Sequence, residues 1–484
     1  MGAVLLLTPG CCLLVALTVA GLRGRGPDVL LCYAGVAGSV VALGSGLTLV
    51  VAHLGGHGAA VTTLGGQLRA DSLSAFMLTS IGAVGLTATL ADAPRRSRPV
   101  PSPSYPALVL LFLGAMSVAV LADNLGVLWV AVEATTVATA FLVGHHGSRH
   151  ALEAAWKYVV LGSVGVAIAF LGIVLLYAAT RSAGVATLSW STLNGTHPAL
   201  DPSLVRLAAA LAILGFATKT GLAPMHSWLP DAHSQAPAPV SGLMSGVLLS
   251  VAFYAILRIQ AVAAPVIGTT MMRSLLATAG LLSLAVATLL MISQRDLKRL
   301  LAYSSVEHVG VLALAASVGG SLAIAAALLH VLGHGLAKAT AFVGSGWVLE
   351  TEGTTRISDL RHLLHRRPGI AIPLLAAVMA LLGLPPFSLF FSEVGIVVAG
   401  FQRGMGWVMA AMVALLMAAF VALVRRLAPM FLGHRSDDVG SPDRTVPGIV
   451  LPLAVALAVT AVAGFAAGPF ATLLTDAAAV LSAP

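Results

Sequence analysis

The sequence has few charged residues for its length. Charged side chains make up 9% of the 484 residues and apolar ones 58%, and the mean hydropathy is +0.98. Soluble globular domains carry about 25% charged residues, which excludes a soluble protein. Aromatic residues are also scarce at 6%. The basic residues lie in short loops between apolar stretches, so the net charge of +8 does not indicate nucleic-acid binding.

Cysteine is almost absent as well. Cys11, Cys12 and Cys32 lie in the first two apolar segments and form no CxxC pair. Zinc and iron–sulfur sites need thiolates at characteristic spacings, so we expect neither a metal nor a cofactor on this chain. The N-terminal apolar run lacks a basic start, which favours a first membrane span over a cleaved signal peptide.

Long apolar segments fill most of the chain. A bilayer core of about 30 Å takes about 20 apolar residues per helix. Fourteen such segments lie between charged, proline-rich and glycine-rich breaks, and the sequence therefore predicts an all-α membrane protein with about 14 transmembrane helices. Their approximate bounds are 3–22, 29–53, 72–91, 106–122, 124–143, 155–178, 204–228, 237–261, 272–292, 300–318, 321–347, 369–400, 405–431 and 447–468.

The basic residues are distributed unevenly among the loops. Of the 26, eighteen follow odd-numbered segments and six follow even-numbered ones, while Lys219 and Lys338 lie inside segments. Lysine and arginine are enriched in cytoplasmic loops. We therefore predict that the odd-numbered loops are cytoplasmic and that both termini lie on the other side of a bacterial-type plasma membrane.

Segments seven and twelve contain helix breakers at membrane depth, in KTGLAP and LGLPP. Such breaks are tolerated only where protein or a water-filled cavity satisfies the freed backbone groups. The two breaks also resemble each other at one offset of 162 residues: Gly221, Leu222, Pro224 and Asp231 match Gly383, Leu384, Pro386 and Glu393. The change from an odd to an even segment predicts an inverted repeat, a pattern typical of transporters.

Glu133 and Lys219 are charged residues in apolar surroundings. Glu133 lies near the middle of segment five and Lys219 just before the first break. A charge at the bilayer centre costs about 2.5–3.5 kcal/mol on insertion scales, so we expect each of these residues to have a charged partner or a function. A lysine whose carboxylate partner moves is a switchable proton site. The alternative is a fixed Glu133–Lys219 ion pair that locks two helices together.

His330, His334 and Lys338 are spaced four residues apart in segment eleven. This spacing places all three on one helix face, and neutral imidazole both donates and accepts protons. A proton relay is one interpretation, and hydrogen bonding between helices is another. A metal site is disfavoured because no nearby Cys or carboxylate in the sequence completes a tetrahedron.

Two carboxylates are candidates for the end of a charge chain. Glu393 lies where the second half of segment twelve should restart, and Glu307 with His308 opens segment ten. Glu307 is near the basic stretch before segment ten, so a solvated or surface salt-bridged role fits it equally well. Glu393 is the firmer candidate.

A polar cluster follows the first break, where His226, Asp231 and His233 could feed protons from the cytoplasmic side or cap helix ends. Lys157, near the cytoplasmic end of segment six, could extend to water along its flexible stem. It could instead modulate Lys219 by repulsion.

Three long motifs resemble one membrane-protein family. KTGLAPMHSWLPDAHSQAPAPVSGLMSG, DLKRLLAYSSVEHVG and HGLAKATAFVGSG are similar to motifs of the antiporter-like membrane subunits of complex I, membrane-bound hydrogenases and multi-subunit cation/proton antiporters. The similarity spans roughly residues 105–430. Glu307 in SSVEH and Ser250 favour the hydrogenase-4 and formate hydrogenlyase branch.

The resemblance implies fourteen helices, inverted repeats over helices 4–8 and 9–13, and discontinuous helices 7 and 12. It also implies a division into an N-terminal unit (1–104), two repeats (105–263 and 264–431) and a C-terminal unit (432–484). The family's proton-path positions fall on Glu133, Lys219, His330, His334 and Glu393. Many relatives carry a lysine eight residues before an arginine in helix eight, where this chain has Ser250. Either water near Ser245 and Ser250 bridges this gap or the subunit conducts poorly.

The resemblance therefore implies a proton-translocating subunit of a redox-driven complex, which has other membrane and peripheral subunits as partners and no redox active site or cofactor on this chain. Two alternatives stay open. The chain could serve a cation antiporter that exchanges Na⁺ for protons without redox partners, or it could be a non-conducting scaffold.

Overall fold

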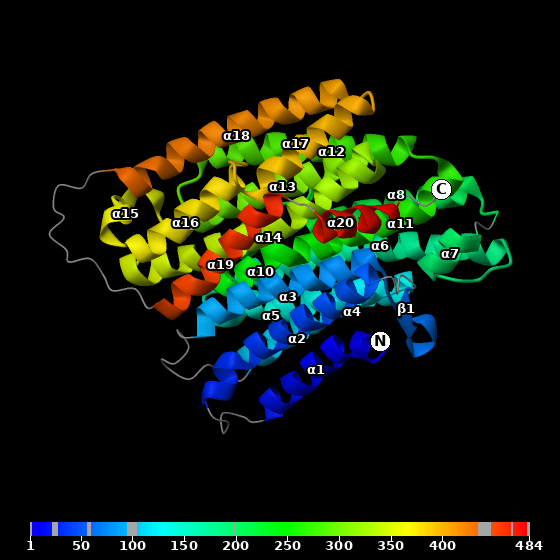
Figure 1. Ribbon diagram of the computed structural model, residues 1–484, viewed down its shortest axis with the longest axis horizontal. Coiled ribbons are helices and arrows are strands. Elements are labelled where there is room, and N and C mark those ends of the chain that lie inside the picture. Colours follow the sequence, from blue (N-terminus) through cyan, green and yellow to red (C-terminus); the bar gives the residue numbers. More distant parts are fainter. Residues whose placement is uncertain are drawn as a thin grey trace.

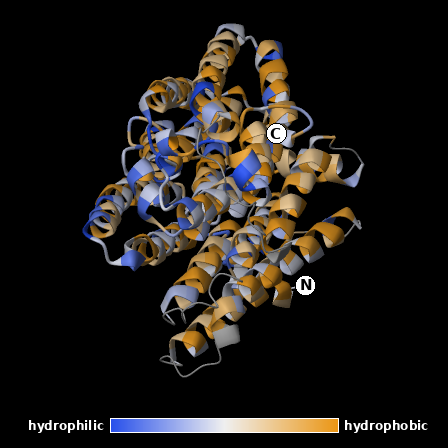
Figure 2. Cartoon of the chain, turned by 90° about the vertical axis from the view of Figure 1, so that its left-hand side faces the viewer, coloured by the Kyte–Doolittle hydropathy of each residue, from blue (hydrophilic) through white to orange (hydrophobic). Residues whose placement is uncertain are grey.

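The computed structural model describes residues 2–21, 28–55, 60–93, 104–196, 199–433, 447–465 and 468–481. In these residues the chain forms a bundle of long helices that lie side by side (Figure 1). Viewed from the end that carries α15, the outer helices are lined with hydrophobic residues and hydrophilic residues gather at the helix ends (Figure 2). The predicted all-α membrane fold is confirmed.

The helices follow the predicted apolar segments closely. Their bounds are α1 Gly2–Gly21, α2 Asp28–Leu54, α3 Ser72–Asp92, α4 Ser104–Leu121, α5 Leu125–Val143, α6 Arg149–Ser182, α7 Trp190–Thr196, α8 Pro202–Thr220, α9 Trp228–Gln235, α10 Ala238–Leu243, α11 Leu249–Ile267, α12 Thr270–Ser293, α13 Leu297–Val318, α14 Gly320–Glu352, α15 Leu363–Arg366, α16 Pro368–Leu381, α17 Ser388–Gln402, α18 Gly406–Leu432, α19 Pro447–Gly464 and α20 Pro469–Ala479.

Twelve helices of the described chain are long and apolar enough to cross a membrane, and α19 with α20, bent by 77°, would make a thirteenth. The α10–α11 span is continuous through a π-helical turn, η4, at Met244–Leu248. The helices α16 and α17 are each short and together occupy the predicted twelfth segment. All fourteen predicted segments therefore contain helix.

Some short elements were not predicted. An antiparallel hairpin of β1 (Val61–Thr63) and β2 (Leu68–Ala70) precedes α3, and the short helix α7 follows α6. The 3₁₀ turn η1 (Leu64–Gly66) lies inside the hairpin, and two further 3₁₀ turns, η3 (Gly144–His146) and η5 (Ile357–Asp359), lie in loops. These pieces are too short to leave a clear hydrophobic period in the sequence.

Side-chain oxygens fix where several spans begin. The side chains of Asp71, Asn124, Asp201 and Asp296 each accept a hydrogen bond from a backbone N–H in the first turn of α3, α5, α8 and α13. Such caps satisfy N–H groups that have no partner inside the helix.

The helix pairings follow the predicted inverted repeat. Within the first repeat α4 packs on α5 and α6 packs on α8, while within the second α12 packs on α13 and α14 packs on α16 and α17. The α10–α11 segment and α13 are buried over a full membrane-crossing length, so the two repeats meet around them. The division at residues 104, 263 and 431 stays a prediction.

The two breaks have matching backbone conformations. Gly221 ends α8 with φ +84°, and Gly383 follows α16 with φ +62°, a left-handed conformation that favours glycine. Protein groups satisfy the freed backbone, as expected: the Ala223 N–H donates to Ser283 Oγ (2.9 Å), and Trp228 Nε1 donates to Thr218 O (2.9 Å). Both interruptions are therefore specific structural features at equivalent positions of the two repeats.

Candidate functional site

Lys219 lies at the end of α8, fully buried, beside the first break. Its Nζ donates to Thr136 Oγ1 of α5 (2.8 Å) and to the Tyr158 hydroxyl of α6 (2.5 Å). The Tyr158 hydroxyl is in turn 2.6 Å from Thr139 Oγ1. Two helices, α5 and α6, thus bring hydroxyl groups to one buried amine of α8, and all of these groups can exchange protons.

Glu133 is close to Lys219 but does not contact it directly. The Thr136 hydroxyl donates to Glu133 Oε2 (3.2 Å) and accepts from Lys219, so it stands between the two charges. Ser163 Oγ of α6 donates to the other carboxylate oxygen (2.7 Å). A fixed Glu133–Lys219 ion pair is therefore wrong for the described chain, because a hydroxyl bridges the two groups.

An aromatic contact leads from Tyr158 to the centre of the bundle. The Tyr158 and Trp228 rings lie 5.0 Å apart, and the Trp228 and His233 rings 6.5 Å apart. His233 is fully buried, stacks on Phe342 of α14 at 5.3 Å, and neither of its ring nitrogens has a hydrogen-bond partner. A capping role for His233 is thereby contradicted, because the ring lies inside the protein.

Lys338 is the second fully buried lysine and lies one helical turn before Phe342. Its Nζ donates to Leu301 O (2.7 Å) and Ser304 Oγ (2.8 Å) of α13. Glu307, one turn further along α13, is only 4% exposed, and its Oε2 has no hydrogen-bond partner. The solvated role considered for Glu307 is therefore wrong, because α13 begins at Leu297 and puts residue 307 mid-helix.

Three histidines cluster next to Glu307. His308 Nδ1 is 3.2 Å from His330 Nε2, and His330 Nδ1 is 2.9 Å from Ser392 Oγ of α17. The ring of His334 lies 5.0 Å from that of His308 and 6.1 Å from that of His330. The predicted shared face of His330 and His334 is confirmed. The pairing with His308 was not predicted, because it joins α13 to α14 through tertiary packing.

Glu393 completes this group from the second broken helix. One ligand atom each from His308, His330 and Glu393 lies within 4.8 Å of the others, an arrangement that could hold a metal ion. The sequence argument that no carboxylate is near the histidines is therefore wrong, because the fold supplies Glu393. A Cβ built on Gly383 would lie 2.5 Å from Glu393 Oε2, so the break leaves room for this carboxylate.

Asp231 and Lys157 form a separate ionic network at the end of the bundle. Asp231 Oδ1 is 2.9 Å from Arg299 Nη1, and its Oδ2 is 3.4 Å from Lys157 Nζ. Lys157 also pairs with Glu153 at 2.7 Å. The Lys157 side chain is 40% exposed, and among the described residues its Nζ bonds to Asp231 and Glu153 and not to the hydroxyl partners of Lys219. His226 is half-buried nearby in sequence, with its Nδ1 unpartnered.

Ser250 does not connect the two halves of the chain by a hydrogen bond. It is 2% exposed and its Oγ has no hydrogen-bond partner among the described residues. Ser245, in the π-helical turn, is bonded to Ser305 Oγ of α13 at 2.7 Å. π-helical turns are frequent at functional sites. Here the turn ties the eighth span to the helix that carries Glu307 and His308.

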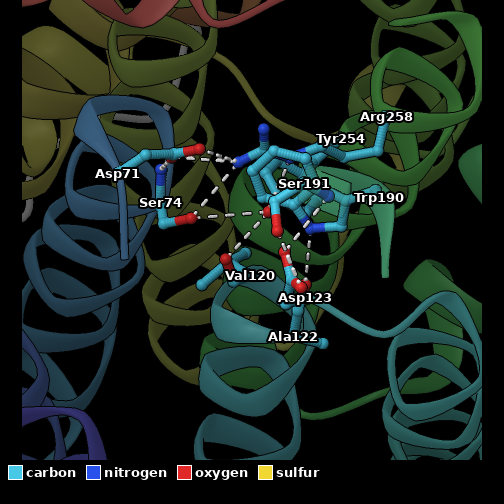
Figure 3. Close-up of polar contacts among 9 residues, drawn as sticks. All are labelled: Asp71, Ser74, Val120, Ala122, Asp123, Trp190, Ser191, Tyr254 and Arg258. Carbon is cyan, nitrogen blue, oxygen red and sulfur yellow. Dashed lines mark hydrogen bonds and ion pairs between the residues drawn. The ribbon is translucent and has the colours of Figure 1, made fainter. Parts of the chain in front are cut away.

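A buried ion pair that includes none of the residues described above was not predicted (Figure 3). Arg258 Nη2 of α11 contacts Asp71 Oδ1 (2.9 Å) and Oδ2 (2.8 Å) at the start of α3. Burial alone would raise the pKa of the Asp71 carboxyl, but Arg258 and the Ser74 N–H hold it below its ordinary value. Asp71 therefore remains charged. An arginine inside an apolar segment was the signal available in the sequence.

Aromatic and carbonyl groups surround the Arg258 guanidinium. Its Nε donates to the Tyr254 hydroxyl (2.9 Å), which donates to Val120 O (2.9 Å), and its Cζ lies 3.8 Å from the centre of the Trp190 ring. Trp190 Nε1 donates to Ala122 O (3.1 Å). In Figure 3 these groups join α3, α4, α7 and α11. The cluster therefore fastens the N-terminal helices to the first repeat.

Two interrupted spans at matching places in an inverted repeat, with buried titratable residues beside them, define a membrane protein of the transporter class. The chain belongs to the family described as NADH:quinone oxidoreductase/Mrp antiporter, TM, which matches residues 122–418. This confirms the resemblance read from the sequence motifs.

Relatives of two kinds are similar over most of the chain. A hydrogenase-4 component F homolog of Methylacidiphilum infernorum is 37% identical over 346 residues, covering 71% of this chain and 72% of that protein. An NADH-quinone oxidoreductase subunit N of Desulforudis audaxviator is 32% identical over 387 residues, covering 79% and 76%. The first relative agrees with the predicted hydrogenase branch.

Solved multi-subunit membrane complexes contain chains of the same fold. A chain of an archaeal membrane-bound sulfane sulfur reductase matches with a TM-score of 0.89 and 26% identity, over 99% of this chain and 98% of that one. A chain of the Mrp complex of a Dietzia species gives 0.85 at 22% identity, over 99% and 98%. This chain is thus an integral membrane protein of a fold found in such assemblies.

Proposed function

We propose that this chain is the proton-translocating membrane subunit of a hydrogenase-like or complex I-like oxidoreductase. The observation that carries the proposal is the row of buried and half-buried titratable and hydroxyl side chains that lie beside the two broken helices and between them. The row comprises Glu133, Thr136, Lys219, Tyr158, His233, Lys338, Glu307, His308, His330, His334 and Glu393. The curated relatives named as hydrogenase and NADH-quinone oxidoreductase components support it.

In the first half, Lys219 holds the proton that is moved. Thr136 connects its amine to the Glu133 carboxylate. Two unit charges about 4 Å apart interact by about 4 kcal/mol at an effective dielectric of about 20. A shift of Glu133 away from Thr136 removes part of this attraction, so Lys219 releases its proton. The Tyr158 hydroxyl accepts and donates at the same site.

In the centre, His233 takes the place of the lysine that relatives carry at position 250. It is buried between Trp228 and Phe342, both of its ring nitrogens are free of hydrogen-bond partners in the described chain, and Phe342 lies one turn from Lys338 on α14. Neutral imidazole accepts a proton at one nitrogen and donates from the other. Water between Tyr158 and His233 would complete the step.

In the second half, Lys338 passes the proton to the histidine cluster and Glu393. Ser304 holds the Lys338 amine one turn from Glu307, and His308 contacts His330 directly. Ser392 orients His330 beside Glu393. Glu393 is half-buried, so it is the group that delivers the proton toward the far side.

The polar end near Asp231 would receive protons from the cytoplasm. The excess of basic residues in the odd-numbered loops supports this orientation, in which both termini would lie on the opposite side of a bacterial-type plasma membrane. The redox centres would lie in peripheral and membrane partner subunits, and we expect no redox cofactor on this chain.

The test is proton uptake by vesicles that contain the native complex, measured with a pH-sensitive dye when the electron donor is added. Uptake that requires the donor and is unaffected by replacing Na⁺ with K⁺ is expected. Sodium-dependent proton flux without any donor would show a cation antiporter instead. Mass spectrometry of the purified complex checks the assignment separately, since redox subunits should copurify.

The cation antiporter is the second candidate, because the family is shared with Mrp antiporters and the Mrp chain has the same fold. A scaffold is the third, because Ser250 replaces a titratable residue. It predicts no effect of Glu133 or Lys219 substitutions on flux.

A further inference from the structure

A strongly basic cavity lies far from the buried row, at the end of the bundle that carries the odd-numbered loops. It has a volume of about 370 Å³ and is lined by residues of η5 and α18, of the loop that follows α12 and of the loops on either side of η5. Five arginines contribute to this lining, and we call this space the arginine cavity. The five arginines are Arg295, Arg356, Arg361, Arg425 and Arg426.

No carboxylate lines this cavity, and none of its arginines forms an ion pair within the described part of the chain. One guanidinium is held in place by backbone: Arg426 donates to the Ile292 carbonyl at the end of α12. Five positive side chains around one hollow repel each other unless an anion lies between them. The volume falls within the range of about 300–1,000 Å³ found for small-molecule sites.

A second cavity of about 370 Å³ adjoins the first and shares Arg425 and Arg426 with it. The rest of its lining is apolar and comes from α12 and α18, namely Ile292, Ala418, Val421 and Ala422. Both helices expose large apolar side chains here, such as Leu289 at 67% and Val421 at 50%. These faces contact hydrocarbon in a membrane.

From these two adjoining cavities we propose that this chain binds an anionic phospholipid. Its phosphate groups occupy the arginine cavity, and an acyl chain lies in the apolar cavity between α12 and α18. Guanidinium groups bind phosphate with paired hydrogen bonds. Basic pockets between membrane helices on the cytoplasmic side are a known type of site for multiply charged lipid head groups.

The shape of the site favours a lipid over other anions. A free phosphate would use the arginines but leave the apolar cavity empty. A lipid with two phosphates, such as a diphosphatidylglycerol, matches both the number of arginines and the apolar neighbour. Phosphatidylglycerol, with one phosphate, should bind more weakly.

The experiment is native mass spectrometry of the purified complex with defined lipids, diphosphatidylglycerol, phosphatidylglycerol and phosphatidylcholine, added in turn. The double variant Arg425→Gln/Arg426→Gln should lower diphosphatidylglycerol affinity by about tenfold or more, because each basic residue near the surface contributes to anionic-lipid binding. Phosphatidylcholine retention should not change.

The matched control is Arg273→Gln/Arg403→Gln. These arginines line a cavity of about 340 Å³ between the ends of α11, α12, α13 and α17, so the control also removes two charges beside a cavity. It should retain wild-type affinity for diphosphatidylglycerol. An equal loss in both double variants would overturn the proposal, because it would reflect net charge alone.

Two further results distinguish a lipid phosphate from free inorganic phosphate in the arginine cavity. Ala418→Phe should fill the apolar cavity and weaken lipid binding, while inorganic phosphate should compete only at high concentration. Lipid binding that is insensitive to Ala418→Phe, or displaced fully by millimolar phosphate, would overturn the lipid assignment. An unchanged melting temperature confirms that each variant is folded.

Discussion

The two buried lysines have the same kind of surroundings. Lys219 donates to two hydroxyls, and Lys338 donates to a hydroxyl and a carbonyl. Neither amine is within ion-pair distance of a carboxylate in the described chain. Neutral oxygens can serve as partners for the ammonium form, and a hydroxyl can also donate to the amine. Each lysine can therefore lose its proton without leaving a carboxylate unpaired.

His233 is the residue on which transfer between the two halves depends. Replacing it with Asn, which cannot carry a proton between two ring nitrogens, should reduce donor-driven proton uptake by more than about tenfold, a change in barrier of about 1.4 kcal/mol. Electron transfer by the partner subunits should continue or slow in parallel. The double variant His233→Asn/Ser250→Lys is the rescue test, because a lysine at position 250 should restore part of the proton flux. Undiminished uptake in His233→Asn would remove this histidine from the path.

The Asp71–Arg258 pair has a structural role that can be tested by pH. Asp71→Asn keeps a side chain able to cap α3 but leaves the Arg258 charge buried and unpaired, so we expect a loss of about 3–5 kcal/mol of stability at pH 7. Because the pKa of Asp71 is lowered in the folded protein, its contribution is complete above the ordinary value of 3.8 and is lost as pH falls below it. Thermal unfolding in detergent should show the difference shrinking in acid.

The control for this prediction is Asp359→Asn, whose carboxylate is exposed. It should unfold like the wild type throughout the pH range. A difference between wild type and Asp71→Asn that grows in acid would contradict the sign of the pKa shift.

Among the elements, the two interrupted helices hold the functional side chains. Both interruptions need glycine in a left-handed conformation, and at Gly383 the missing side chain also leaves space for Glu393. Helix ends at membrane depth expose backbone groups that protein atoms or water must satisfy. The same exposed polarity makes these places suited to moving charge.

Gly383→Ala should therefore impair proton transfer beyond its effect on stability. The new Cβ would meet Glu393 Oε2 at 2.5 Å and push this carboxylate away from the histidines. Gly404→Ala is the matched control, because Gly404 also has a positive φ of +75° but nothing lies within 4 Å of a Cβ there. Both should lose about 1 kcal/mol from backbone strain. Only Gly383→Ala should lose proton uptake, and equal uptake in the two variants would contradict a positional role for the break.

Much of the element structure could be predicted from the sequence. Long apolar runs locate helices directly, and breakers such as Pro224 and Pro386 mark the interruptions. The hairpin before α3, α7 and the π-helical turn at Met244–Leu248 could not be predicted, because short or irregular pieces leave no period in hydrophobicity. The start of α13 was placed three residues late, which is why Glu307 was taken for a helix-end residue.

At the scale of the whole molecule, tertiary packing decides which charges meet. The sequence predicted Glu133, Lys219, His330, His334 and Glu393 as path residues, and the fold brings each beside other polar groups. It could not reveal that Tyr158 and Thr136 bind Lys219 or that His308 pairs with His330, because these contacts join different helices. The Thr136 hydroxyl that bridges Glu133 and Lys219, in place of the direct ion pair considered as an alternative, could not be predicted for the same reason.

Two buried polar contacts, an ion pair and a hydrogen bond, also connect different groups of helices in the molecule. The Asp71–Arg258 pair fastens the N-terminal helices to the first repeat, and the Ser245–Ser305 bond ties the eighth span to α13.

The most direct measurement is donor-driven proton uptake by vesicles containing the complex with Lys219→Ala or Glu133→Gln, beside the control Ser250→Ala. The predicted result is a loss of more than about tenfold in the first two variants, with the complex still assembled, and full uptake in Ser250→Ala. Undiminished uptake in both Lys219→Ala and Glu133→Gln would contradict the proposal that protons pass through this row of residues.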